Sequence, residues 1–322
     1  MAPRVGADQF RLENASLPVP ILDHARVNVV IEASGVEPVG DGRHLIIAHD
    51  KAAPLHVLDL ATGALVGEPI TAPKFPATAN GGPKWEGMAR DSEGAFYVVG
   101  AHNGKTDEER AAKSHLMRFR LKDSAVPMID QDSVSRFEIA RSLVAALKAE
   151  GLDEAAVGKR KIEGLAIREK NGGREIVIGL REPGDKVRAF VADVSKKADG
   201  AALELKPLFA FEAEPREGVQ SQLTSMEYVP PLGGFLVVTA SEDADNAFHG
   251  NNLWFVADGE TRHARKIATF EVAMKAEGLA VLGVETAGDE ISVRLLVTYD
   301  NDPHATKIPS RFQTVTLVRA SR

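Results

Sequence analysis

Glutamates stand in three copies of one short phrase, Glu-Gly-hydrophobe-Ala, at residues 86–89, 163–166 and 277–280. Each copy is followed by a polar turn and then by an apolar run rich in β-branched residues. A phrase that recurs at intervals of tens of residues is typical of a repeat architecture. Equivalent positions of such repeats lie around a common centre. Carboxylates that converge there repel one another unless a cation or an arginine neutralises them, or some are protonated.

A second set of polar residues follows the apolar runs. If each phrase begins the first strand of a hairpin and each run is its second strand, both sets lie at the same end of the hairpins, because the strands are antiparallel. This set includes Asp50, His102, Arg181, Glu242, Asp243, Asp300 and His304.

Three kinds of site are compatible with this chemistry. Carboxylate and amide oxygens with few nitrogens suit calcium, or magnesium as the alternative. A pocket for a polar small molecule would use arginine as its donor. In a purely structural interpretation, each glutamate instead caps backbone amides of the neighbouring repeat. The candidate metal ligands are Glu37, Glu86, Glu163, Glu277, Asp50 and Asp300.

With a metal, these residues predict a calcium-dependent hydrolase that acts on an ester, a phosphoester or a lactone. The metal would polarise the substrate oxygen or lower the pKa of a bound water. His102 or His304 would be the general base, and Arg181 would hold the developing negative charge. The alternative is a non-catalytic β-propeller that binds a small ligand or a protein partner through the same face, with the acidic residues or a metal in a structural role. The residues leave open whether the chain is an enzyme.

The elements that must position these residues are five β-hairpins. Each is followed by a third strand, and the first four by a short fourth strand. This order predicts an all-β fold, a β-propeller with five blades, or six if residues 4–24 or 105–160 form another. The last unit lacks a fourth strand of its own. The apolar segment 27–32 is expected to fill that place, so that an N-terminal strand closes the ring.

One helix interrupts the strands. Leu143, Ala146, Leu147 and Leu152 recur at helical spacing before and just after Gly151, which predicts an amphipathic helix near residues 140–151. It belongs to an insertion at about 105–160 that is rich in Ala, Lys and Glu. We expect residues 1–322 to form one propeller domain with this insertion.

Composition excludes several classes of function. The formal net charge of −7 argues against a nucleic-acid-binding protein, and the absence of cysteine excludes disulfides and thiolate ligands. No apolar run approaches the ~18 residues that span a bilayer, so no membrane association is expected. The first ten residues have no apolar segment typical of a secretion signal, which favours a cytoplasmic protein. Oligomeric state is not indicated.

The phrases resemble a known family. Glu-Gly-Leu-Ala at 163–166 with Ile-Gly-Leu-Arg-Glu-Pro at 178–183 resembles the EGLA…GxRxP stretch of a bacterial family known as domain of unknown function 3616. Residues 86–89, with Gly-Ala-His at 100–102, are similar to the preceding blade of that family, except that Ser114-His115 comes later than its Gly-Ser-His. The resemblance covers about residues 30–320 and implies a propeller of uncharacterised function.

A wider likeness is to phytase-like and lactonase-type propellers. In those proteins an acidic residue that opens the innermost strand of a blade ligates a central calcium ion. The likeness implies a metal role for Glu37, Glu86, Glu163 and Glu277. Because one fold hosts many functions, this likeness concerns the fold and implies the metal role only by analogy.

Overall fold

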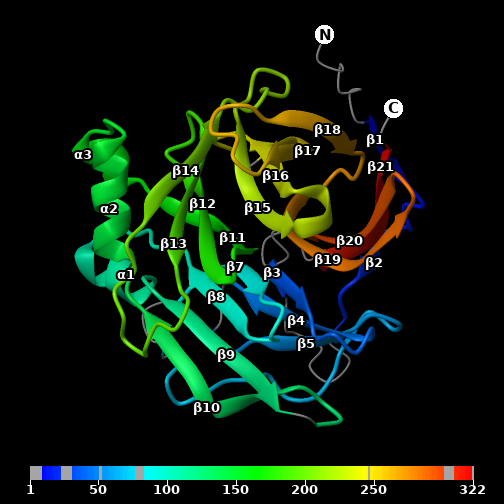
Figure 1. Cartoon of the computed structure of the whole chain (residues 1–322), viewed down its shortest axis with the longest axis horizontal. Helices are drawn as coiled ribbons and strands as arrows, with labels where there is room; N and C mark the ends of the chain where they lie inside the picture. The colour runs from blue at the N-terminus through cyan, green and yellow to red at the C-terminus, as the bar shows by residue number, and fades with distance from the viewer. Residues whose placement is uncertain are drawn as a thin grey trace.

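Five antiparallel sheets surround a common centre (Figure 1). The computed structural model describes residues 9–22, 31–50, 53–76, 83–122, 124–245, 247–300 and 308–320. The all-β class, the propeller and the five blades predicted from the sequence are confirmed.

Each blade is a meander that begins at its innermost strand. The first two blades comprise β3 (Ala33–Pro38), β4 (His44–His49), β5 (His56–Asp59) and β6 (Ala64–Leu65), then β7 (Trp85–Arg90), β8 (Phe96–Gly100), β9 (Leu116–Lys122) and β10 (Met128–Phe137). The third and fourth comprise β11 (Lys161–Lys170), β12 (Gly173–Glu182), β13 (Val187–Asp193) and β14 (Lys206–Phe211), then β15 (Ser221–Val229), β16 (Gly234–Glu242), β17 (Phe248–Ala257) and β18 (Arg265–Phe270). The fifth comprises β19 (Lys275–Ala287), β20 (Glu290–Asp300), β21 (Arg311–Ala320) and the N-terminal strands β1 (Gln9–Glu13) and β2 (Val19–Pro20).

An N-terminal strand does close the ring, but it is a different one from that predicted. β1 pairs with β21 from Gln9 opposite Ala320 to Glu13 opposite Thr316. Phe10 fits this place because its ring packs on Phe255 of the fourth blade, with ring centroids 5.2 Å apart. Of the segment 27–32, residues 27–30 lie outside the described part of the chain, and Ile31 and Glu32 are not in a strand.

Every inner strand has an extra residue near its start that is not paired directly with the second strand of its blade. β12 has a further bulge at Arg181, and β19 has a further bulge at Leu282. The pairing of β7 with β8 skips from Trp85 to Gly87, which leaves Glu86 in a β-bulge. We call the residue at this place the bulge residue. The five bulge residues are Ser34, Glu86, Glu163, Thr224 and Glu277.

Inner strands approach closely just after the bulge. A Cβ atom added to Gly87 would lie 2.8 Å from Cβ of Leu165 on the next blade, so glycine is required there. The fourth blade has Ser225 at this position, and its hydroxyl accepts a hydrogen bond from the Leu279 amide at 3.0 Å. The ring of inner strands is therefore joined by close backbone contact as well as by side chains.

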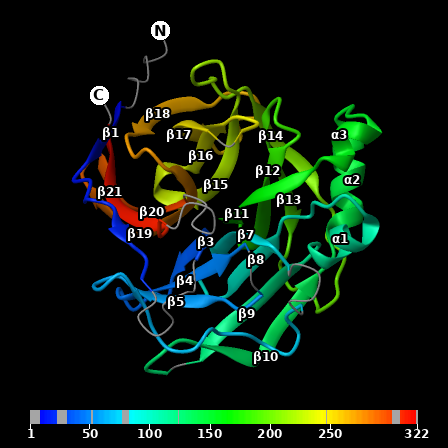
Figure 2. The ribbon, with the colours of Figure 1, turned by 180° about the vertical axis from the view of Figure 1, so that it is seen from behind.

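Three α-helices lie together at the outside of the propeller (Figures 1 and 2). α2 (Ala140–Ala149) is the predicted helix and buries Leu143, Ala146 and Leu147 against the core between the second and third blades. The sequence analysis missed α1 (Asp107–Ala112) and α3 (Glu154–Gly158), although Thr106 and Asp153 are ordinary N-cap residues. No helix in the described ranges is long and apolar enough to cross a membrane.

Candidate functional site

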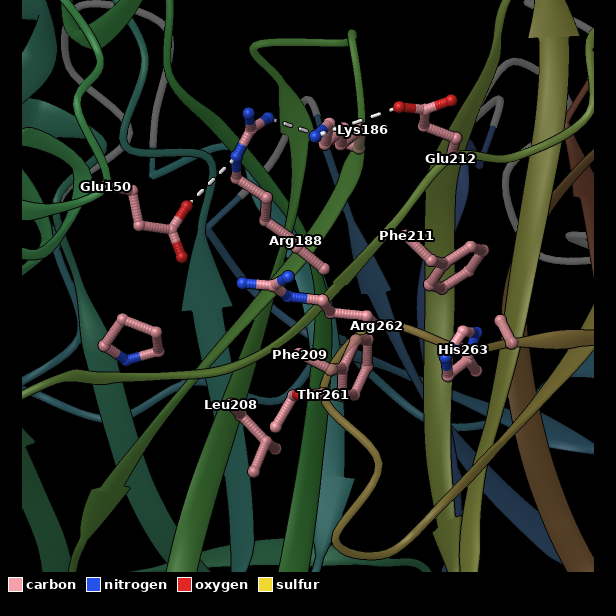
Figure 3. Close-up of a pocket in the computed structure, with 13 residues that line it drawn as sticks. Glu150, Lys186, Arg188, Leu208, Phe209, Phe211, Glu212, Thr261, Arg262 and His263 are labelled. Carbon is pink, nitrogen blue, oxygen red and sulfur yellow. Dashed lines mark hydrogen bonds and ion pairs between the residues drawn. The ribbon is translucent and has the colours of Figure 1, made fainter.

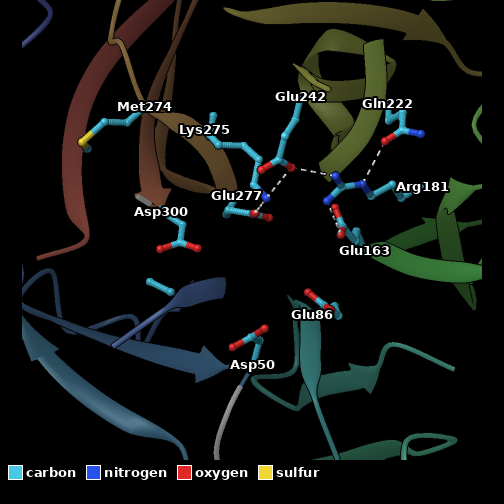
Figure 4. Close-up of polar contacts among 12 residues, drawn as sticks. Asp50, Glu86, Glu163, Arg181, Gln222, Glu242, Met274, Lys275, Glu277 and Asp300 are labelled. Atoms are coloured by element: carbon cyan, nitrogen blue, oxygen red, sulfur yellow. Dashed lines mark hydrogen bonds and ion pairs between the residues drawn. The ribbon is translucent and has the colours of Figure 1, made fainter. Parts of the chain in front are cut away.

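Charged side chains from all five blades converge at one end of the inner strands (Figure 4). We call them the charged ring. It consists of Asp50, Lys84, Glu86, Lys161, Glu163, Arg181, Glu242, Lys275 and Glu277.

The first half of the ring joins three blades. Nζ of Lys84 lies 3.1 Å from Oδ2 of Asp50 and 3.3 Å from Oε1 of Glu86. Nζ of Lys161 lies 3.3 Å from the same Oε1 and also contacts Glu163. Each ammonium group therefore sits between two carboxylates, one from its own blade and one from the preceding blade.

The second half continues to the fifth blade. The Arg181 guanidinium lies 3.0 Å from Oε1 of Glu163 and 2.8 Å from Oε2 of Glu242. Nζ of Lys275 lies 3.1 Å from Glu242 and 2.6 Å from Oε1 of Glu277. Negative and positive groups thus alternate from Asp50 to Glu277.

Burial and charge shift the pKa values of two glutamates in opposite directions. Burial alone would raise the pKa of Glu163, but Arg181, Lys161 and Lys275 lower it to about 2. For Glu277, burial outweighs the attraction of Lys275, and repulsion from Glu163 and Asp300 adds to it, so the pKa rises to about 7. Glu277 can therefore exchange a proton near neutral pH, whereas Glu163 stays ionised.

The structure brings some of the residues predicted from the sequence together in the charged ring, and not others. The ring contains six of them: Asp50, Glu86, Glu163, Arg181, Glu242 and Glu277. Asp300 lies beside the ring, where its charge acts on Glu277, and its Oδ1 accepts a hydrogen bond from the Ser310 hydroxyl at 3.3 Å. His304 lies outside the described residues.

Glu37 does not occupy the place predicted for it. The bulge residue of its blade is Ser34, and Glu37 lies three positions further along β3. The same offset from Thr224 on β15 leads to Glu227, and the two buried carboxyl groups form a hydrogen bond. Burial raises the pKa of Glu37 to about 7 and that of Glu227 well above its ordinary value. Because two adjacent carboxylates repel, this pair retains a proton at neutral pH.

His102 is buried away from the ring. Its side chain is fully covered, and the charged groups that act on it are Arg160, His115 and Arg136, none of which belongs to the ring. Burial, reinforced by these neighbours, lowers the pKa of His102 to about 3. His102 is therefore neutral.

The sequence analysis missed the lysines. Each glutamate of the repeated phrase is preceded two residues earlier by a lysine, so the complete phrase is Lys-x-Glu-Gly-x-Ala in all three copies. That spacing is readable in the sequence and would have predicted the alternation of charge. The fourth cation, Arg181, was identified.

The ring does not suit a resident calcium ion. Glu86, Glu163, Glu242 and Glu277 each lie within 3.3 Å of a lysine or arginine nitrogen, so a cation would have to displace one of these groups. Among the described residues, no cluster of three or more His, Asp or Glu side chains is placed to hold a metal.

A pocket of about 900 Å³ lies far out on the third blade, not at the ring (Figure 3). It is lined by β14 and by the segment that leads into β18. Arg188 at its edge is held by Glu150 at 3.2 Å and Asp185 at 2.6 Å, so its charge is balanced.

Comparisons with known proteins give distant structural likenesses. No family model matches the chain, including the family that the sequence resembles, and no curated protein matches it. A gluconolactonase from Xanthomonas campestris superposes at a TM-score of 0.40 with 11% identity, covering 98% of this chain and 99% of that one. The luciferin-regenerating enzyme superposes at 0.39 with 9% identity, covering 93% and 92%. A nidogen/laminin complex reaches 0.40 with 8% identity, covering 84% and 76%. These likenesses are too distant to carry an argument about activity.

Proposed function

We propose that the charged ring binds a small polyhydroxylated molecule. The observation that carries this proposal is the alternation of ammonium or guanidinium donors with carboxylate acceptors across five blades. A hydroxyl group donates one hydrogen bond and accepts others, so neighbouring hydroxyls of one ligand can use a donor and an acceptor of the ring in turn. Such a ligand needs no net charge.

The depth of the ring groups supports this proposal. The Lys84, Lys161, Lys275 and Arg181 side chains are 22, 17, 16 and 15% exposed. The carboxylates of Glu86 and Glu163 lie deeper, at 3 and 1%. Ligand oxygens would therefore meet cationic donors first and buried acceptors behind them. The second oxygen of Glu163, Oε2, has no hydrogen-bond partner among the described residues and would accept from a ligand hydroxyl.

Hydrolysis of an ester or lactone of that ligand is the second candidate. Glu277 favours it, because a carboxyl with a pKa of about 7 can act as a general base. Its carboxylate would take a proton from the water that attacks the carbonyl carbon, while Lys275 or Arg181 stabilises the oxyanion. The C–O bond then breaks and the proton passes to the leaving alkoxide. The sequence also predicts a phosphoester as a substrate class for the hydrolase. A calcium ion would compete with the polyhydroxylated ligand for the charged ring.

Calorimetric titration with polyols, sugar acids and their lactones tests both candidates. We expect saturable binding by the native protein and a loss of at least about tenfold in affinity for Glu163→Gln. Glu290→Gln is the control, because that glutamate pairs with Arg11 at 3.1 Å on the surface. Glu277→Gln should abolish any turnover while retaining binding. Absence of binding across the panel, or equal binding by Glu163→Gln, would contradict the proposal.

A further inference from the structure

Arg160 is a buried cation that has no ion-pair partner among the described residues. Its residue is 9% exposed, Nη1 donates to the Val157 carbonyl at 3.1 Å, and Nε has no partner. Within the described part of the chain no carboxylate forms an ion pair with it. A buried charge of this kind costs several kcal/mol unless something pairs with it.

The neighbours of Arg160 add positive charge. Burial lowers the pKa of the Arg160 guanidinium, and repulsion from Arg110 lowers it further, with Asp107 opposing. His102 and His115 are neutral, because burial and nearby arginines lower their pKa values to about 3 and about 4. The acid whose charge acts on Arg160 is Asp107, which forms its ion pair with Arg110 instead.

A pocket of about 640 Å³ is lined by Gly158 and Lys159, the two residues that precede Arg160. It lies between the loop that leads to α1 and the end of α3, and is lined by Asn103, Gly104, Lys105, Arg110, Lys159 and Glu182, among others. The ammonium groups of Lys105 and Lys159 form no ion pair with any described residue. Arg110 is held at 2.7 Å both by the Gly104 carbonyl and by Asp107, so it is fixed at the pocket wall.

We infer that this pocket binds a compact anion of the phosphate class, held by Lys105, Lys159 and Arg110, with Arg160, the residue that follows Lys159, adding positive charge from outside the lining. Either inorganic phosphate or the phosphate group of a small molecule has this chemistry. Three or four cations around a dianion form charge-assisted hydrogen bonds, which are the strong ones. The single acid among the residues that line the pocket, Glu182, accepts a hydrogen bond from Gln222 at 2.9 Å. This site is separate from the one proposed for that ring.

Thermal melting of the full chain in inorganic phosphate tests the inference. Sulfate and acetate at equal ionic strength separate phosphate-like anions from carboxylates, and a sugar phosphate tests for an attached ligand. We expect a saturable rise in melting temperature with phosphate. It should be lost in Arg160→Met and weakened at least about tenfold in apparent affinity in Lys159→Ala.

Stability without phosphate separates a binding role from a structural one. Arg160→Met should leave the melting temperature unchanged or raised, because it removes an unpaired buried charge. Arg188→Met is the matched control: Arg188 is similarly buried but paired with Glu150 and Asp185, so its loss should lower the melting temperature and keep the phosphate response. An equal phosphate response in Arg160→Met, no response in the native protein, or destabilisation by Arg160→Met without phosphate would overturn the inference. Glu163→Gln should keep the phosphate response, because Glu163 belongs to the charged ring and does not line this pocket. The two proposals can therefore fail independently of each other.

Discussion

At the scale of single residues, the charged ring places each of its four cations between two of its five carboxylates. Glu163 shows how: its buried carboxylate contacts Lys161 from its own strand and Arg181 from the adjacent strand of the same blade. Buried ion pairs contribute little net stability when complete, but removal of one member leaves the others unpaired.

Glu163→Gln should therefore lower the free energy of unfolding by about 3 kcal/mol, because Lys161 and Arg181 each lose one of their two counter-charges. Glu290→Gln, which breaks an exposed pair, should cost less than about 1 kcal/mol. Urea unfolding at pH 7 measures both. Equal effects of the two variants would show that the ring contributes no more than a surface ion pair.

The Glu37–Glu227 pair predicts a pH dependence of stability. The pKa of Glu37 is raised from 4.5 to about 7 and that of Glu227 is also raised, so the folded chain holds more protons than the unfolded chain above pH 4.5. The stabilising contribution of the pair is complete below pH 4.5 and is lost as the pH rises through about 7.

Glu227→Gln removes this titration. We expect the variant to be more stable than the native protein at pH 8, and its stability to fall less between pH 5 and pH 8. Urea unfolding at both pH values gives the comparison, with Glu290→Gln as the control that keeps the native slope. If the slopes of Glu227→Gln and the native protein coincide, the shared proton is excluded.

Much of the site could be predicted from residue types, and the failures have specific causes. Glu86, Glu163 and Glu277 were found because they share a phrase. Glu37 was misplaced because the blade was read from its turn at residues 40–42, whereas the bulge that sets the register falls at Ser34. The burial of His102 is set by how distant parts of the chain pack around it, which no local pattern reveals.

At the scale of elements, the bulge and the following glycine determine how closely the inner strands approach. Gly87 lies against Leu165 of the next blade, whereas Gly283, on inner strand β19, has open space at its Cβ position. The two glycines therefore provide a matched comparison.

Gly87→Ala should destabilise the protein by about 1–3 kcal/mol through overpacking. Gly283→Ala should be neutral or stabilising by up to ~1 kcal/mol, because it reduces the entropy of the unfolded chain. Denaturant unfolding of the two variants checks this. Equal tolerance of both substitutions would mean that the blades can separate without cost.

The strands were predicted well because buried runs such as 45–48 and 176–179 lie between clear turns. α1 and α3 were missed because they have only 6 and 5 residues, too few to show helical periodicity. The only sequence signals for these two helices are their N-cap residues, Thr106 and Asp153.

At the scale of the whole molecule, β1 links the two ends of the chain and removes a free edge from β21. Local pattern could not identify it, because the segment 27–32 is more apolar than Gln9–Glu13. The contact between Phe10 and Phe255 of another blade decides the pairing.

Removal of residues 1–13 should lower the melting temperature by about 5 °C, because Phe10 and Leu12 lose their contacts, and should promote association through the exposed edge. Calorimetry and light scattering measure the two effects. Leu17→Ser, at an 86% exposed position, serves as the control. A truncated chain that melts like the native protein would show that closure contributes no stability.

The central claim is that the protein's own lysines and arginine, rather than a metal, neutralise the carboxylates of the charged ring. The most direct test is the melting temperature of chelator-treated protein with and without millimolar calcium. The structure predicts no change, because Lys84, Lys161, Arg181 and Lys275 already occupy the positions between the carboxylates. A calcium-dependent rise that Glu163→Gln abolishes would contradict this account.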